Sequence, residues 1–375
     1  MKWWEKPWNP VVGCTEISEE CIHCWARSIH ERFHKDKKFS DVELKPQLLD
    51  NPLKRKVKTT YFVCNVSDLF HDDVPVDFIR EVYAVMTLAY WHNFFVLTKR
   101  PERAFAILTD EDWYNSLLAK ADVVRLRNHL SADVGISDPR RIPPKNIAFG
   151  VTAGNEHRAD QRIPIALRVP AYRHFLSYEP ALGPLDFSGH RLEWIAPFKE
   201  TDAMLNRTPR LDLIIAGGEN HPDAMDCNVN WFRKLLRQCK PEGTRVCIKQ
   251  LGTHPFEVDP IEDDLALDAS YDEEADPADV AAMAAASVRK IKVSDRAGAI
   301  MEEWPEDLRV QESLEFGYPD AQASSGRPVD RAQQDLFSPS SPEQRMWHNL
   351  IRVDRAQQDL FSPIPEKDPD KDEEF

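Results

Sequence analysis

Short apolar runs alternate with segments of helical period from the start of the chain to about residue 255. Two segments, Pro75–Trp91 and Asn228–Lys240, carry apolar residues at the spacing of an amphipathic helix. The runs between them are nearly continuous in β-branched and aromatic residues, which is typical of parallel strands buried on both faces. We expect six strands, at Thr59–Asn65, Asn93–Thr98, Asn146–Thr152, Tyr172–Tyr178, Leu211–Ala216 and Thr244–Lys249.

Strands that alternate with helices predict an α/β fold built on a parallel sheet. Polar residues follow these strands closely, and the carboxyl ends of the strands form the active site in parallel α/β barrels. The pattern therefore favours a partial (β/α)6-type barrel with one shared cleft over an open doubly wound sheet. The polar residues in question are Ser67, Asp68, Lys99, Arg100, Asn155, Glu179, Glu219, Lys249 and Gln250.

The composition changes after the last predicted strand. Residues 257–285 are acidic and rich in alanine, which predicts an acidic insertion, either mobile or a polar helix. Val288–Trp304 is expected to return to the domain as a last strand and helix, so that the barrel domain spans residues 1–315. Residues 316–375 are rich in Pro, Ser, Gln and Asp and predict a disordered tail. Within it the segment VDRAQQDLFSP occurs twice, at Val329–Pro339 and Val353–Pro363.

Charge and apolar content restrict the function. The formal net charge of −15 argues against a protein that holds DNA by bulk electrostatics, although a local basic cleft remains compatible with it. No apolar run approaches the roughly 20 residues that span a bilayer, and the first residues lack the apolar core of a signal peptide. We therefore expect no membrane association and a cytoplasmic location.

Three of the seven cysteines are close in sequence and follow the pattern C-x6-C-x2-C: Cys14, Cys21 and Cys24. Uneven spacing argues against a disulfide framework, whereas neighbouring thiolates suit a soft metal or a cluster. A 4Fe-4S cluster on three cysteines leaves one iron open, where S-adenosylmethionine can bind and be cleaved to a 5′-deoxyadenosyl radical. Structural zinc prefers four ligands, and His23 or His30 could supply the fourth.

Seven motifs within residues 1–252 resemble a bacteriophage-associated three-cysteine family of radical S-adenosylmethionine type. They are WNPVVGC…CIHCWA, NVSDLFHDDVP, LTKRPERA, GVTAGN…RI, FLSYEPALGPLDF, IIAGGEN and CIKQLG. The resemblance implies a partial radical-SAM barrel, a 4Fe-4S cluster on the three cysteines, S-adenosyl-L-methionine as cofactor and an electron donor as partner. The chain departs from the usual C-x3-C-x2-C spacing, has Trp25 where Tyr is usual, and has His221-Pro222 in place of a small-residue turn.

The strand-end residues take cofactor-binding roles in this interpretation. Ser67 and Asp68 lie where such enzymes bind the methionyl amino group, and the alternative is a helix N-cap ahead of Pro75. Lys99 and Arg100 are expected to bind the cofactor carboxylate or a substrate phosphate, the alternative being two surface cations.

Other strand-end residues are candidates for ribose binding and catalysis. Thr152 and Asn155 are expected to hydrogen-bond the ribose of the cofactor. Glu179 and Glu219 are the catalytic candidates, which would bind hydroxyls, steer an amine or move a proton, unless they belong to ordinary tight turns. Among the remaining cysteines, we expect Cys64, Cys239 and Cys247 to pack in the interior, and Cys227 to lie on a loop as a possible second redox thiol.

The predicted function is radical chemistry on a nucleobase in DNA, such as isomerisation or remodelling of a hypermodified thymine in phage DNA. Three alternatives remain: a radical DNA-lesion repair lyase, a radical enzyme acting on a free nucleotide or peptide, and a non-catalytic zinc-binding protein associated with DNA. The repeated QQDLF resembles the peptide by which bacterial proteins dock on the sliding clamp, unless it is a duplication without consequence or a helix that packs on the barrel. The clamp contacts would be Gln333, Leu336, Phe337, Gln357, Leu360 and Phe361.

Overall fold

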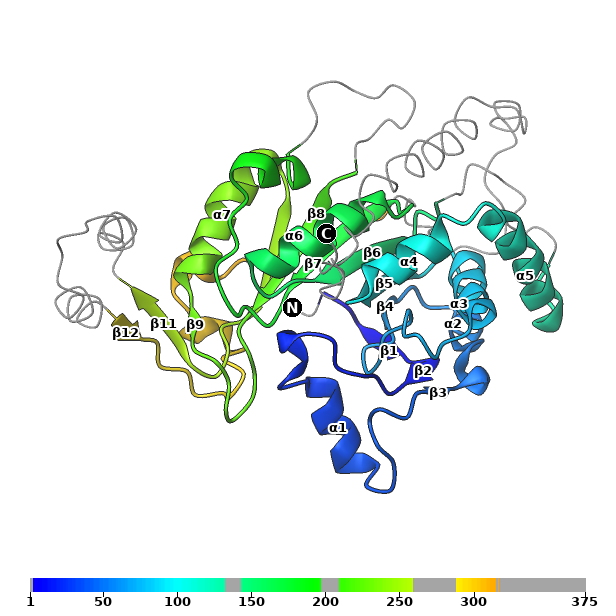
Figure 1. Cartoon of the computed structure of the whole chain (residues 1–375), viewed down its shortest axis with the longest axis horizontal. Coiled ribbons are helices and arrows are strands. Elements are labelled where there is room, and N and C mark those ends of the chain that lie inside the picture. Colours follow the sequence, from blue (N-terminus) through cyan, green and yellow to red (C-terminus); the bar gives the residue numbers. More distant parts are fainter. Residues whose placement is uncertain (1–2, 132–142, 197–208, 259–287, 315, 317–375) are drawn as a thin grey trace, which may run out of the picture. The chain divides into compact units, whose positions relative to one another are not determined.

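The computed structural model describes residues 3–131, 143–196, 209–258, 288–314 and 316 of the chain (Figure 1). Its centre is a seven-stranded sheet in which all neighbouring strands are parallel, in the order β1-β4-β5-β6-β7-β8-β10. The sheet curls into a half-barrel. The strands are β1 (Lys6–Trp8), β4 (Thr60–Val63), β5 (Asn93–Thr98), β6 (Ile147–Thr152), β7 (Arg173–Tyr178), β8 (Leu211–Gly217) and β10 (Arg245–Gln250).

All six predicted strands are present, with ends that differ by at most two residues from the expected ones. The edge strand β1 was not predicted, because three residues that include a proline give no periodic signal. The predicted strand at Thr59–Asn65 ends early, at Val63. Cys64 adopts φ 55°, a left-handed backbone conformation that breaks the extended chain.

Helices connect the successive strands of the sheet except β7 and β8, between which the described residues form only the 3-10 segment Gly189–Trp194. They are α1 (Trp25–Phe33), α2 (Asn51–Lys54), α3 (Val76–Leu88), α4 (Pro101–Leu108), α5 (Trp113–Arg127), α6 (Glu156–Arg168) and α7 (Asn230–Glu242). Helices α3 and α7 confirm the two predicted amphipathic segments. Helix α7 ends at Gly243, whose φ of 70° provides the left-handed C-terminal cap that glycine adopts readily.

Two apolar clusters cover the opposite faces of the sheet. Helix residues such as Ile79, Ile163 and Phe232 pack with one set of strand residues in the larger cluster. The alternate strand residues form the smaller cluster. There the ring of Trp3 lies 4.8 to 6.0 Å, between centroids, from the rings of Phe62, Phe95 and Phe175. Burial on both faces explains why the strand sequences are almost continuously apolar.

Two small sheets flank the half-barrel: β2 (Val11–Val12) pairs with β3 (Glu43–Leu44), and β11 (Pro255–Val258) lies between β9 (Cys227–Asn228) and β12 (Val288–Lys290). The prediction that Val288–Trp304 returns to the domain as a strand and a helix is confirmed in part, because Val288–Lys290 forms a strand and Trp304 packs in the larger apolar cluster. Strand β12 belongs to the separate small sheet. A turn at Gly298, with φ 58°, and the 3-10 segment Met301–Glu303 stand where the helix was expected.

The predicted acidic insertion begins inside β11, since Glu257 and Val258 belong to that strand. The rest of it, 259–287, and the tail, 317–375, lie outside the described residues. The domain boundary at residue 315 therefore stays a prediction. None of the described helices is long and apolar enough to cross a membrane.

Candidate cofactor pocket

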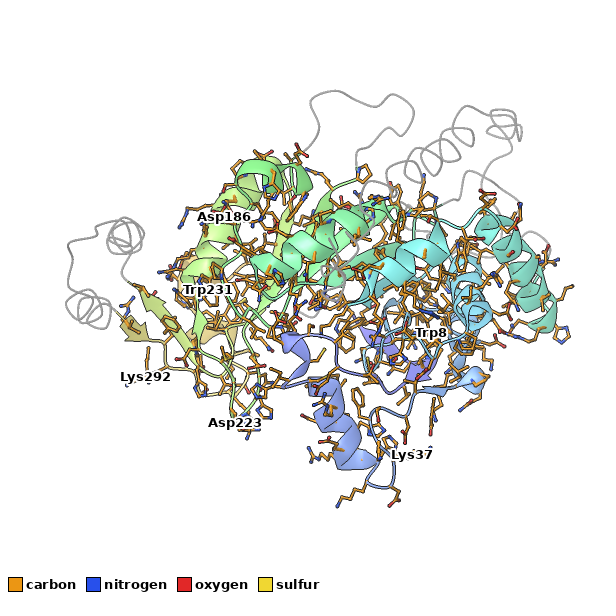
Figure 2. The ribbon with its side chains drawn as sticks, viewed as in Figure 1. Trp8, Lys37, Asp186, Asp223, Trp231 and Lys292 are labelled. Atoms are coloured by element: carbon orange, nitrogen blue, oxygen red, sulfur yellow. The ribbon has the colours of Figure 1, made fainter. Side chains whose placement is uncertain are left out.

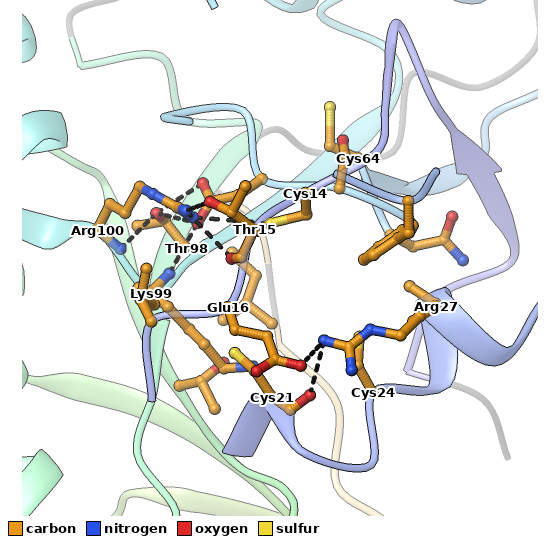
Figure 3. Close-up of a pocket in the computed structure, with 18 of the residues that line it drawn as sticks. Cys14, Thr15, Glu16, Cys21, Cys24, Arg27, Cys64, Thr98, Lys99 and Arg100 are labelled. Carbon is orange, nitrogen blue, oxygen red and sulfur yellow. Dashed lines mark hydrogen bonds and ion pairs between the residues drawn. The ribbon is translucent and has the colours of Figure 1, made fainter. Parts of the chain in front are cut away.

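Cys14, Cys21 and Cys24 line one pocket beside the carboxyl ends of β4, β5 and β6 (Figure 3). The cavity measures about 150 Å³. Five of the residues predicted to bind the cofactor line the same pocket, because the parallel strands end at a common edge. They are Ser67, Asp68, Lys99, Arg100 and Thr152.

The backbone in front of Cys14 is held by a glycine. Gly13 has φ 91°, and a Cβ there would lie 2.6 Å from the carbonyl oxygen of Asp41. The Cys14 amide then donates to the carbonyl of Phe39 at 2.8 Å. A larger residue at position 13 would clash with backbone, so the Gly-Cys pair fixes where the first thiol enters the pocket.

The segment between the first two cysteines is attached to α6 by two ion pairs that the sequence did not suggest. Glu19 binds Arg158 at 2.6 Å near the surface. Glu20 is buried and binds Arg162 at 3.0 Å, and its Oε1 also accepts the amide hydrogen of Gly154. The two arginines are four residues apart, so they lie on one face of the helix. The spacing alone does not indicate which carboxylates the two arginines contact.

Arg100 connects the pocket to the turn after β5. Its guanidinium donates to Asp68 Oδ2 at 3.2 Å, to Thr15 Oγ1 at 3.0 Å and to Cys14 Sγ at 3.7 Å. Asp68 accepts further hydrogen bonds from the hydroxyl of Thr98 and the amide of Lys99. Arg100 and Asp68 are thus part of a buried network.

The pocket changes the acidity of two thiols in opposite directions. Burial, aided by the carboxylate of Asp68, raises the pKa of Cys14 to about 11. Burial acts the same way on Cys21, but the charge of Lys99 and hydrogen bonds from the backbone of Ile17 and Ser18 outweigh it and lower the pKa. Because the thiolate is the form that binds metal, Cys21 is the better prepared of the two as a ligand.

A fourth cysteine, Cys64, also lines the pocket. It was expected to pack in the interior within a buried strand; it is buried in the larger apolar cluster as expected, but it lies just after β4. Its sulfur points away from the other three cysteines (Figure 3), and burial raises its pKa to about 12. Cys227, expected on a loop, lies in β9 and is fully buried, and neither Cys239 nor Cys247 is among the pocket residues.

Three of the predicted site residues do not line this pocket. Asn155 is the N-cap of α6, where its side chain accepts the amide hydrogen of Arg158 at 3.0 Å. Glu179 forms an ion pair with Lys249 at 2.5 Å. Glu219 is buried and receives the amide hydrogen of Met225 at 2.9 Å. Their predicted roles in ribose binding and catalysis stay predictions.

The histidine inside the cysteine motif turns toward β8 rather than toward the pocket. His23 Nδ1 lies 2.9 Å from Glu219 Oε2, and its ring stacks on His221 with centroids 4.4 Å apart. His30 is buried beside Phe39. Neither His23 nor His30 lines the pocket as the fourth ligand that a zinc site would need.

The pocket offers the three cysteine sulfurs as donors for a metal cofactor. Within the described ranges, no three His, Cys, Asp or Glu side chains are already gathered around a single point that could hold a metal ion. Three sulfur donors around one pocket nevertheless fit an iron–sulfur cluster in ligand type, and the two adjacent cations Lys99 and Arg100 offset thiolate charge. The residues present therefore fit a three-cysteine cluster.

Fold and pocket define an α/β protein with a parallel half-barrel and a three-cysteine pocket at the strand ends. The chain belongs to DUF5131, a family of proteins of unknown function, whose profile matches residues 1–306. No curated protein matches the chain. No solved structure matches it either.

Proposed function

We propose that the protein is a radical S-adenosylmethionine enzyme that acts on DNA. The observation that carries the proposal is the presence of Cys14, Cys21 and Cys24 around one pocket at the ends of parallel strands. The same pocket holds Ser67 and Lys99, which the family resemblance assigns to cofactor binding.

The three cysteines would hold a 4Fe-4S cluster, which when bound supplies the electron that cleaves S-adenosyl-L-methionine to a 5′-deoxyadenosyl radical. Lys99 is half-buried at the pocket, and its Nζ lies 3.5 Å from the carbonyl of Glu20. An ammonium there can bind the cofactor carboxylate. Ser67 and Thr152 offer hydroxyls on the neighbouring strand ends.

The segment 22–38, next to the cysteine motif, is rich in basic residues and exposes two aromatic rings, which supports DNA as the substrate, although Arg27 and Lys37 form ion pairs with Glu16 and Glu43. Residues 22–38 hold five Lys or Arg and two Asp or Glu, although the whole chain is acidic. Trp25 and Phe33 are 51% and 66% exposed, and Lys37 lies beyond the end of α1, away from the sheet (Figure 2). Exposed aromatic rings among cations suit the stacking of bases and contacts to phosphates.

The finer proposal is isomerisation or remodelling of a hypermodified thymine in phage DNA, with repair of a DNA lesion as the related alternative. It rests on the phage resemblance and on the repeated clamp-like motif, which lies outside the described residues. Mass spectrometry of nucleosides from DNA made with and without this gene tests it, and identical nucleosides in both samples would contradict it.

Structural zinc is the second candidate, and the position of Cys64 favours it. A closed zinc site requires four ligands, and Cys64 is a fourth cysteine at the pocket. Its sulfur would have to turn toward the other three, which it does not face in the structure (Figure 3).

Metal analysis of cysteine variants distinguishes the two candidates. After anaerobic reconstitution, the protein should be brown, and replacing Cys14, Cys21 or Cys24 by Ala should abolish iron retention and 5′-deoxyadenosine formation. Cys64→Ala should keep the iron, and Cys239→Ala, on α7, is the matched control for losing a buried thiol. A colourless protein with one zinc per chain, lost in Cys64→Ala, would overturn the radical enzyme in favour of zinc.

A further inference from the structure

Among the described residues, Arg100 is the only candidate cofactor ligand whose side chain donates a hydrogen bond to the sulfur of a cysteine in the motif. Its Nη1 lies 3.7 Å from Cys14 Sγ, within the range of a hydrogen bond to sulfur, and 3.2 Å from Asp68 Oδ2. Its Nη2 donates to the carbonyl and hydroxyl of Thr15 at 3.3 and 3.0 Å. Figure 3 shows this network beside Cys14.

The partners of Arg100 are themselves held in place. Asp68 accepts from Thr98 Oγ1 at 2.8 Å, and Thr15 Oγ1 also lies 2.8 Å from His71 Nε2. Arg100 is 8% exposed. A planar guanidinium fixed on two sides and buried in this way is oriented toward the sulfur and cannot reach a cofactor carboxylate without breaking the network.

We propose that Arg100 is a positioning residue that donates a hydrogen bond to the thiolate of Cys14 and thereby raises the reduction potential of the cluster. This inference rests on the proposed function. It replaces, for this residue, the expectation that Arg100 binds the carboxylate of S-adenosylmethionine.

The physical reason is charge. One-electron reduction of a 4Fe-4S cluster from its 2+ to its 1+ state adds negative charge to iron and its sulfur ligands. A hydrogen bond to a ligand sulfur and a nearby buried cation stabilise the more negative state, and both raise the potential. Arginine keeps its proton in proteins, so its charge is always present.

Redox titration of the reconstituted full-length protein, followed by electron paramagnetic resonance with dithionite as the one-electron donor, tests the inference. Arg100→Gln removes the charge and the hydrogen bond and should move the midpoint potential to a more negative value. Arg100→Lys keeps the charge but cannot bond to both Asp68 and Cys14. Its midpoint potential should therefore lie between those of wild type and Arg100→Gln. Arg103→Gln, one turn along α4, is the control and should match wild type.

The outcomes separate the inference from the proposed function. Equal potentials in wild type, Arg100→Lys and Arg100→Gln would overturn the role of Arg100 while leaving the radical enzyme intact. If Arg100→Gln does not fold or hold iron, Arg100→Lys alone decides: an unchanged potential overturns the inference, and a more negative one supports it. Wild-type protein that forms no cluster would overturn the proposed function, and the inference with it.

Discussion

Asp68 was expected to bind the amino group of the cofactor, and the structure gives its carboxylate several partners within the protein. The two oxygens accept from the amides of Phe70 and Lys99, the hydroxyl of Thr98 and the guanidinium of Arg100. The alternative of a helix N-cap does not hold, because Pro75 occupies the N-cap of α3. A cofactor contact of Asp68 stays a prediction, whereas its structural role follows from these bonds.

Asp68→Asn should lower the free energy of unfolding by about 3 kcal/mol, since it leaves the buried charge of Arg100 without its partner. Urea denaturation at neutral pH measures the change. The control is Asp72→Asn, because Asp72 is 79% exposed and lies 3.9 Å from Arg103. That variant should differ from wild type by less than about 0.5 kcal/mol. Equal stability of the two variants would contradict the structural role of Asp68.

The spacing of the cysteines in the sequence predicted only some of those that line the pocket. The C-x6-C-x2-C pattern correctly grouped Cys14, Cys21 and Cys24 around one pocket. It gave no sign that Cys64 would join them, because a left-handed turn at the end of a strand leaves no periodic trace in the sequence.

At the scale of elements, the cysteine segment depends on a helix far along the chain. Glu19 and Glu20 contact Arg158 and Arg162, 139 and 142 residues away. The pair nearer the surface is partly hydrated, whereas Glu20 and Arg162 are buried. Burial makes the second pair the stronger constraint on where the 3-10 segment Glu19–Cys21 lies.

Arg162→Met should therefore destabilise the protein by about 3 to 5 kcal/mol, because it leaves the carboxylate of Glu20 buried without its countercharge. Arg158→Met is the matched variant one turn earlier on α6, and it should cost less than about 1 kcal/mol. Thermal and urea unfolding of both variants measure the difference. Equal losses would show that the buried pair does not anchor the cysteine segment.

At the scale of the whole molecule, the parallel half-barrel brings the ends of β4, β5 and β6 to one edge, where the pocket forms. The predicted clamp partner rests on the amino-acid sequence alone, in the two QQDLF motifs, which lie outside the described residues. Leu and Phe side chains are suited to fill an apolar cleft, and two copies raise the effective concentration at a ring with several equivalent clefts.

The full-length chain should bind a bacterial sliding clamp through these motifs. The variant Leu336→Ala/Phe337→Ala/Leu360→Ala/Phe361→Ala should bind at least about 30-fold more weakly, since each aromatic or aliphatic anchor contributes about 2 kcal/mol. Surface plasmon resonance on immobilised clamp measures both. Ser338→Ala/Ser362→Ala, just outside the motifs, should bind like wild type. Equal binding by the three proteins, or none by any, would end the clamp hypothesis.

The amino-acid sequence by itself determined the six main strands, helices α3 and α7, and the three-cysteine motif. Apolar periodicity and cysteine spacing are local properties, so they can be read along the chain. The tertiary structure decided what each side chain contacts. Arg100 beside Cys14, Glu20 beside Arg162 and His23 beside Glu219 all join residues far apart in sequence. Such contacts depend on how strands and helices pack against one another, and no local sequence pattern encodes that packing.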